Sequence, residues 1–131
     1  MSRHELIEKA IEVRKLAYVP YSKFPVGAAL RTSSGKVYTC CNVENASYSL
    51  TFCAERVAIF KAISEGKTKF VEMAVAANTD RPVPPCGACR QVMSEFFPKT
   101  MEIHLANLNN ELKTFTMESL LPFSFDMEDL S

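Results

Sequence analysis

The chain has 131 residues, of which 47% are apolar, and its 15 basic side chains balance 15 acidic ones. A chain of this size and composition can bury one hydrophobic core, so we expect residues 1–131 to form a single folded domain. A net charge of zero without runs of like charge argues against a nucleic-acid partner, because nucleic-acid binders usually present a basic face. No apolar run approaches the roughly 20 residues that a membrane span needs, so we expect no membrane partner and a cytoplasmic location.

The N-terminal segment is predicted to form an amphipathic helix. Ser2 and Glu5 have the spacing of a capping box at its start. Its apolar stripe consists of Leu6, Ile7, Ala10, Ile11 and Ala17. The charged residues within this segment are unlike the uninterrupted apolar core of a signal peptide. Pro20 and Pro25 then bracket a loop that cannot be helical throughout.

Two strands follow this loop. Residues 26–32 (VGAALRT) and 37–43 (VYTCCNV) are rich in residues that favour strands, and residues 33–36 form the turn between them. Residues 44–52 are polar and irregular, so we expect a loop there.

The second half of the chain alternates helices with strands. Helices are expected at residues 53–64, with Gly66 as the C-terminal cap, and at residues 87–97, where Pro98 ends the helix. A short helix is expected at residues 117–121. The predicted strands are 70–78, which looks buried on both faces, 101–107 and 112–116. This order predicts an α/β fold, a three-layer α/β/α sandwich with a mixed five-stranded sheet.

Cys86 and Cys89 have C-x-x-C spacing at the start of a predicted helix, where the helix dipole stabilises thiolates. This spacing suits two ligands of one metal ion and also a redox pair. A thioredoxin-like redox motif should follow the first strand of its fold. Here the motif comes late in the chain, after the proline-rich loop at residues 79–85, which favours metal binding.

Cys53 also begins a predicted helix, and two helices that flank one strand can bring their amino ends to the same end of a sheet. We therefore expect Cys53, Cys86 and Cys89 to bind one zinc ion, with a fourth position open for water. The neighbouring Cys40 and Cys41 point to opposite faces of a strand and are interpreted as buried small apolar side chains. His104 lies in mid-strand without ligand spacing, so its expected role is structural.

Glu55 follows Cys53 by two positions, so its carboxylate can reach the open metal position without coordinating. A carboxylate beside activated water is a proton shuttle, which makes Glu55 the predicted catalytic residue. Acidic residues are also common in first helical turns for electrostatic reasons alone. Three thiolates give a zinc site a net negative charge, and Arg56 could offset this charge by donating N–H groups to a ligand sulfur. The alternative for Arg56 is a solvated helix residue.

The pattern Cys-Ala-Glu followed by Pro-Cys-x-x-Cys resembles the signature of zinc-dependent deaminases. The segments PYSKFPVGAAL, CNVENASY, CAERVAIFKA and PCGACRQ together resemble the homotetrameric type of the cytidine and deoxycytidylate deaminase family. Similarity runs from the first helix to the LLPFSF segment. The resemblance implies hydrolytic deamination of cytidine and deoxycytidine in pyrimidine salvage, one zinc per subunit, and active sites shared between the subunits of a homotetramer.

The resemblance also implies a nucleoside pocket. Phe24 would stack on the pyrimidine, Asn42 and Glu44 would bind the ribose hydroxyls, and the backbone N–H of Ala54 would hold the carbonyl oxygen of the base. The residues that would reach into a neighbouring subunit's site are Ala46, Tyr48 and a C-terminal aromatic, best matched by Phe125 although Phe123 is also a candidate. The residue types agree with a nucleoside, because an anionic Glu44 would repel a phosphate.

Other functions stay open at this stage. A related deaminase could act on a modified nucleoside or an antibiotic, and a polynucleotide-editing enzyme would need a basic channel. From a different class, the chain could be a zinc-stabilised binding domain without activity. The sequence does not rank cytidine against deoxycytidine.

Overall fold

Five strands form one mixed sheet in the computed structural model, which describes residues 2–125. The strands are β1 (Val26–Thr32), β2 (Val37–Cys41), β3 (Phe70–Ala77), β4 (Glu102–Ala106) and β5 (Leu112–Thr116). Their order across the sheet is β2-β1-β3-β4-β5, and β3 and β4 are parallel while the other neighbouring pairs are antiparallel. The predicted mixed sheet of five strands is confirmed.

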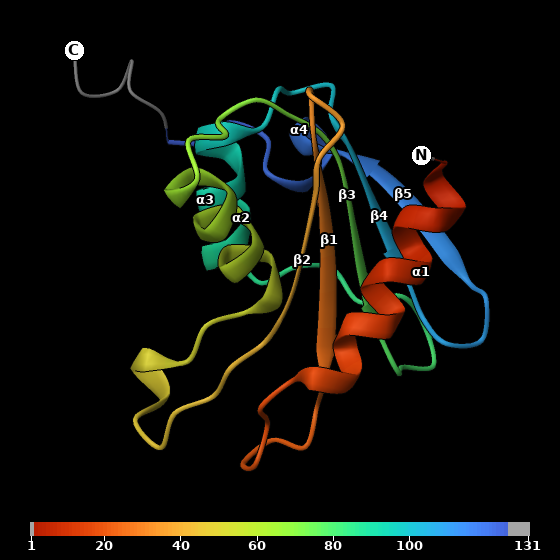
Figure 1. Ribbon diagram of the computed structural model, residues 1–131, viewed down its shortest axis with the longest axis vertical. Helices are drawn as coiled ribbons and strands as arrows, with labels where there is room; N and C mark the ends of the chain where they lie inside the picture. Colours follow the sequence, from red (N-terminus) through yellow and green to blue (C-terminus); the bar gives the residue numbers. More distant parts are fainter. Residues whose placement is uncertain (1, 126–131) are drawn as a thin grey trace.

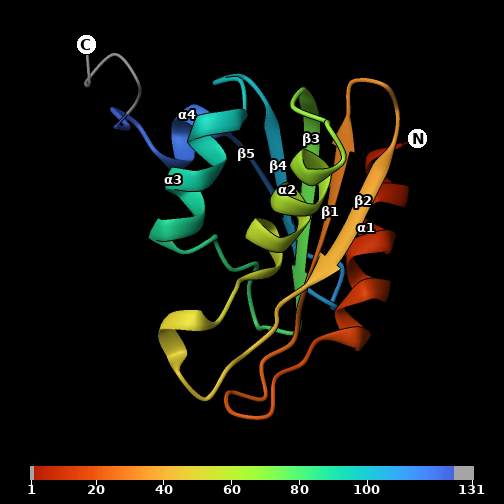
Figure 2. The same cartoon turned by 60° about the vertical axis from the view of Figure 1, so that its left-hand side comes forward.

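Helices cover both faces of this sheet (Figures 1 and 2). Helix α1 (Arg3–Val13) packs on β1 and β3, whereas α2 (Ala54–Ser64) and α3 (Gly87–Phe96) lie together on the opposite face. The short helix α4 (Met117–Leu120) contacts α3 and β5. Two single turns of 3-10 helix, η1 (Arg14–Leu16) and η2 (Tyr48–Leu50), complete the described elements. This is the predicted α/β/α arrangement, and none of the described helices is long and apolar enough to cross a membrane.

The helix ends follow the local sequence signals in most places. The Ser2 hydroxyl accepts a hydrogen bond from the Glu5 N–H at 3.2 Å, as a capping residue should. At the end of α2, Gly66 has φ +84°, and the N–H groups of Gly66 and Lys67 bond back to the last turn, as in a Schellman motif. The predicted stripe of α1 extends too far, because the chain tightens into η1 and Ala17 is extended.

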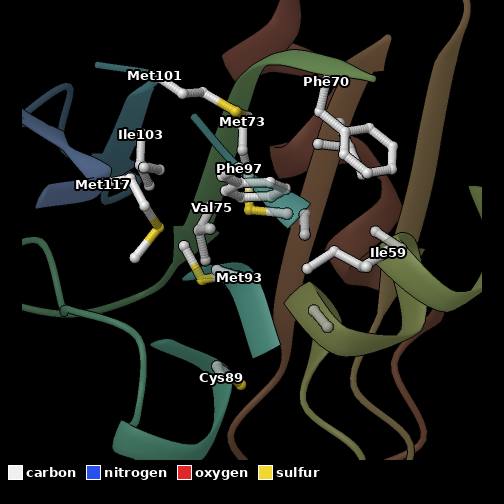
Figure 3. Packing of buried hydrophobic residues seen from close by; sticks show 14 of the residues in the cluster. Ile59, Phe70, Met73, Val75, Cys89, Met93, Phe97, Met101, Ile103 and Met117 are labelled. Carbon is white, nitrogen blue, oxygen red and sulfur yellow. The ribbon is translucent and has the colours of Figure 1, made fainter. Parts of the chain in front are cut away.

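The larger of two hydrophobic clusters fills the space between the sheet and helices α2 and α3. Figure 3 shows Met73, Val75 and Ile103 from the sheet near Met93 of α3, with Cys89 at the edge of this cluster. Cys40 belongs to the same cluster, as expected, whereas its neighbour Cys41 is half-buried. The core therefore supports α2 and α3, the two helices that carry the predicted metal ligands.

A smaller cluster beneath α1 brings helix and sheet unusually close. It is built mainly from alanines, with Ala10 of α1 facing Ala29, Ala74 and Ala76 of the sheet. A Cβ atom on Gly27 would lie 1.9 Å from the Ala10 carbonyl oxygen, so only glycine allows this approach. The close contact fixes the start of β1, which lies beside the candidate site.

Candidate active site

Three cysteine sulfurs meet where α2 and α3 begin. Cys53 is the N-cap residue of α2, Cys86 is the N-cap residue of α3, and Cys89 lies in the first turn of α3. Their Sγ atoms all lie within 4.8 Å of one another, and those of Cys53 and Cys86 are 3.7 Å apart. The Cys86 sulfur also accepts a hydrogen bond from the Cys89 N–H at 3.4 Å. Both helix dipoles therefore favour negative charge on the sulfurs.

Hydrogen bonds and a nearby positive charge favour a thiolate at Cys53. The Cys89 thiol is the main cause, since its hydrogen bond lowers the pKa of Cys53 to about 5 against the opposing effect of burial. Arg56 adds to the shift, because its Nη2 donates to the Cys53 sulfur at 3.6 Å. The guanidinium carbon of Arg56 also lies 5.4 Å from the centre of the Phe52 ring. The Arg56 side chain thus faces the sulfur cluster.

The donor set fits zinc. Two sulfurs bound to a tetrahedral zinc at 2.3 Å would be about 3.8 Å apart, close to the separation of Cys53 and Cys86. Three sulfur ligands are typical of zinc, and three rather than four protein ligands are typical of a catalytic site. Cys53, Cys86 and Cys89 could therefore hold the ion.

Glu72, Glu102 and His104 form a second group with possible ligand atoms within 4.8 Å of one another. The His104 ring, however, is hydrogen-bonded through both nitrogens, to Glu72 at 2.5 Å and to Thr114 at 2.9 Å. Arg31 donates to the other oxygen of the Glu72 carboxylate at 2.9 Å. Because both His104 nitrogens and both Glu72 oxygens already have partners, this network links neighbouring strands, which agrees with the structural role expected for His104.

A pocket of about 250 Å³ opens beside the sulfur cluster. Six of the predicted site residues line it: Phe24, Asn42, Cys53, Ala54, Glu55 and Cys86. The other lining residues were not predicted from the sequence; they are Val26, Thr51, Phe52, Val75, Ala77, Val83, Pro84 and Pro85. Five of these lie in the short runs directly before Cys53 (residues 51–52) or Cys86 (residues 83–85), and this adjacency is the signal that could have identified them.

Glu55 is the second residue of α2 and is buried, with 4% of its surface exposed. Burial raises the pKa of the Glu55 carboxyl group to about 7, so this side chain can hold or release a proton near neutral pH. The adjacent Ala54 is the first residue of α2, and its backbone N–H has no acceptor within the helix. The pocket thus combines a proton carrier with a hydrogen-bond donor.

Asn42 and Glu44 hold the loop that carries Phe24. The Asn42 side chain accepts from the Val26 N–H and donates to the Phe24 carbonyl oxygen, both at 2.9 Å. The Glu44 carboxylate accepts from the N–H groups of Tyr21 and Ser22 at 3.1 Å and from the Ser22 hydroxyl. Asn42 lines the pocket, whereas Glu44 is not one of the lining residues.

Among the remaining predicted contact residues, Ala46, Phe123 and Phe125 are not part of the lining of the pocket in their own chain. Ala46 is exposed in the loop before η2, and Tyr48 is the first residue of η2. Phe123 and Phe125 are exposed in the C-terminal segment. The Gln91 side chain donates to the Phe125 carbonyl oxygen at 2.8 Å, which attaches this segment to α3.

Arg90, next to Gln91, also links segments that are distant in the sequence, a role that was not predicted. Its guanidinium donates to the carbonyl oxygens of Pro85 and Leu120 at 2.9 and 2.8 Å. These bonds connect the loop before Cys86 with the end of α4.

The fold and the donor set together are those of a zinc-binding deaminase domain. Residues 1–105 match the family model described as the cytidine and deoxycytidylate deaminase zinc-binding region. The chain belongs to this family.

Individual relatives agree with the family assignment. A cytidine deaminase from Halalkalibacterium halodurans is 53% identical over 131 residues, covering 100% of this chain and 99% of the relative. The crystal structure of cytidine deaminase from Burkholderia pseudomallei superposes with a TM-score of 0.93 at 49% identity, covering 95% of this chain and 100% of that one. A blasticidin-S deaminase from Bacillus cereus is 33% identical over 129 residues, covering 92% of this chain and 90% of the relative.

The sulfur cluster generates a test of metal binding. We expect the purified chain to bind one zinc ion, and Cys86→Ser to lower the zinc-to-chain ratio well below one because a ligand is lost. Cys41→Ser is the matched control and should keep the full zinc content, since Cys41 lies on β2. Elemental analysis after dialysis measures the ratio. Full zinc content in Cys86→Ser would contradict this ligand set.

Proposed function

We propose that residues 1–131 act as one deaminase domain that converts cytidine and deoxycytidine, with water, to uridine and deoxyuridine plus ammonia. One observation carries the proposal: a buried carboxyl group, Glu55, shares a pocket with Cys53 and Cys86, two of the three clustered cysteines. A zinc-stabilised binding domain does not need a buried acid beside its metal ligands. The family membership supports the same chemistry.

When held by Cys53, Cys86 and Cys89, zinc supplies Lewis-acid activation of water. Glu55 takes a proton from this water and delivers it to the ring nitrogen next to the carbon that bears the amino group. The oxygen that has lost this proton bonds to the carbon that bears the amino group. The same carboxylate then takes the second proton from the hydroxyl group now on that carbon and passes it to the amine, so the carbon–amine bond breaks, a carbonyl forms and ammonia leaves as a neutral molecule. The raised pKa of Glu55 near 7 suits a group that must both accept and donate.

The residues around the pocket suit a neutral nucleoside. The Phe24 ring can stack on the base, and the Ala54 N–H can donate to the carbonyl oxygen of the base. Asn42 and Glu44 are proposed to bind the sugar hydroxyls. Glu44 accepts three hydrogen bonds within the chain, which leaves about one of its four lone-pair sites for a sugar hydroxyl.

A second candidate function is deamination of an antibiotic or modified nucleoside. The similarity to a blasticidin-S deaminase favours this alternative, but identity to the cytidine deaminase from Halalkalibacterium halodurans is higher. The decrease in ultraviolet absorbance on mixing the chain with cytidine, deoxycytidine or blasticidin S compares the three substrates directly. Faster turnover of the antibiotic than of cytidine would replace the proposed substrate.

The catalytic role of Glu55 is tested by Glu55→Gln, which removes the proton carrier and keeps the shape. We expect a folded, zinc-loaded protein with kcat lower by about 10²–10⁴-fold or more, because proton transfer is lost in both directions. Glu95→Gln, at an exposed position on α3, is the matched control. A variant that retained parental activity would instead indicate a non-catalytic zinc domain.

Arg56 is proposed to offset the negative charge of the three thiolates. Its hydrogen bond to the Cys53 sulfur supports this role, as does its position between that sulfur and Phe52. Charge compensation keeps a sulfur-rich site acidic enough to activate water.

Removing this charge by Arg56→Gln should weaken zinc binding by about tenfold. The acidic limb of the pH–rate profile should also move to higher pH, because a more negative site is a weaker Lewis acid. Zinc affinity and kcat/KM against pH are the measurements, with Lys61→Gln on the exposed face of α2 as control. An unchanged profile and affinity would remove Arg56 from the mechanism.

The chain is further proposed to form a cytoplasmic homotetramer with shared active sites. Five free thiols suit a reducing compartment. Large apolar side chains are exposed on several elements and on the C-terminal segment, which is unusual for a monomer. They include Leu16, Leu50, Phe52, Phe60, Phe123 and Phe125. In the tetramer Ala46, Tyr48 and Phe125 would reach a neighbouring pocket.

Light scattering tests the assembly. We expect a mass four times that of the 14.7 kDa chain, because burying these apolar side chains between subunits removes them from water. A monomeric mass at micromolar concentration, with full activity, would rule out shared sites.

A further inference from the structure

Ser22 connects Phe24, which lines the pocket, with Glu44 through its hydroxyl group. An ionised carboxylate can only accept hydrogen bonds, so the Ser22 hydroxyl must donate its proton to Glu44. The same oxygen then has lone pairs free, and it accepts from the Phe24 N–H at 3.1 Å. The hydrogen bonds therefore run in one direction, from Phe24 to Ser22 to Glu44.

The backbone of the loop is shaped to allow this connection. Lys23 has φ +61°, a left-handed conformation that few residues with a side chain adopt. It turns the chain so that the N–H of Phe24 points back to the side chain two residues earlier, as in other serine turns. Such strain persists only where surrounding contacts stabilise it. Here the Glu44 carboxylate stabilises the loop by accepting hydrogen bonds from the N–H groups of Tyr21 and Ser22.

Phe24 is consequently held on both sides. Its N–H is bonded to Ser22, and its carbonyl oxygen is bonded to the Asn42 side chain. Phe24 as a whole is 38% exposed and lines the pocket, so neighbouring side chains do not enclose it. The position of the ring depends on its backbone, and the loop lies at the same end of the sheet as the starts of α2 and α3 (Figure 2).

We propose that Ser22 is a positioning residue for substrate binding: anchored by Glu44, its hydroxyl fixes the backbone of Phe24 and so holds the Phe24 ring against the pyrimidine. This role rests on the proposed function. The hydrogen bond from Ser22 is also the main cause that lowers the pKa of Glu44, which keeps the anchor ionised. Ser22 touches no reacting atom, and it acts through Phe24.

The kinetic test compares Ser22→Ala with Ser22→Thr. Loss of one hydrogen bond to the Phe24 backbone should raise KM for cytidine about three- to tenfold. Because a stacked ring binds substrate and transition state alike, kcat should stay within about twofold. Ser22→Thr keeps a hydroxyl at an exposed position and should restore the parental KM. Ser33→Ala, an exposed serine in the β1–β2 turn, is the matched control.

A merely structural effect of the substitution is detected by zinc content and the unfolding temperature, which we expect to stay parental in all variants. A parental KM in Ser22→Ala would overturn the positioning role. So would a Ser22→Thr variant that behaves like Ser22→Ala.

A double-mutant cycle tests whether Ser22 acts through Phe24. In a Phe24→Ala background, Ser22→Ala should change KM by less than about twofold, because the ring that Ser22 positions is absent. An equally large change in both backgrounds would show that Ser22 acts by another route.

Hydrogen exchange of the Phe24 amide gives an answer that does not depend on turnover. Exchange should be faster in Ser22→Ala than in the parent and parental in Ser22→Thr, since the hydroxyl protects this N–H. Equal exchange in the parent and Ser22→Ala overturns the proposed contact, whether or not the chain deaminates cytidine. Absence of cytidine turnover in the parent overturns the proposed function instead.

Discussion

The amino ends of α2 and α3 meet at one end of the sheet, and the site depends on this convergence. Three sulfurs that carry negative charge would repel one another, yet those of Cys53 and Cys86 are 3.7 Å apart. Two helix dipoles and the Arg56 guanidinium supply the opposing positive charge, and a bound zinc ion would supply more. The same helix start presents the Ala54 N–H and the Glu55 carboxyl group to the pocket.

The rest of the fold holds the amino ends of α2 and α3 in place. A core rich in methionine and aliphatic side chains holds both helices on the sheet, and α1 packs closely enough to require glycine at position 27. The loops that complete the pocket have no core of their own. Polar side chains hold them instead: Asn42 and Glu44 bind the loop before β1, and Arg90 binds the loop before α3.

Local signals were enough to predict most element boundaries. Ser2 caps α1, Gly66 ends α2, and the order of elements predicted a mixed sheet with helices on both faces. The error at Ala17 has a simple cause, because periodicity does not reveal where a helix tightens into a 3-10 turn. The apolar spacing continues to Ala17, although the α-helix ends at Val13.

The sequence by itself determined the chemistry of the donors: three cysteines at expected helix starts and a carboxylate two residues after one of them, in a chain with no net charge. Only the tertiary structure decided their distances and environments. Cys53 and Cys86 are 33 residues apart, and burial by distant segments raises the pKa of Glu55. The bond from Ser22 to Glu44 likewise joins residues that are separated by a whole hairpin. Contacts of this kind have no local signature, because strand pairing and helix packing create them.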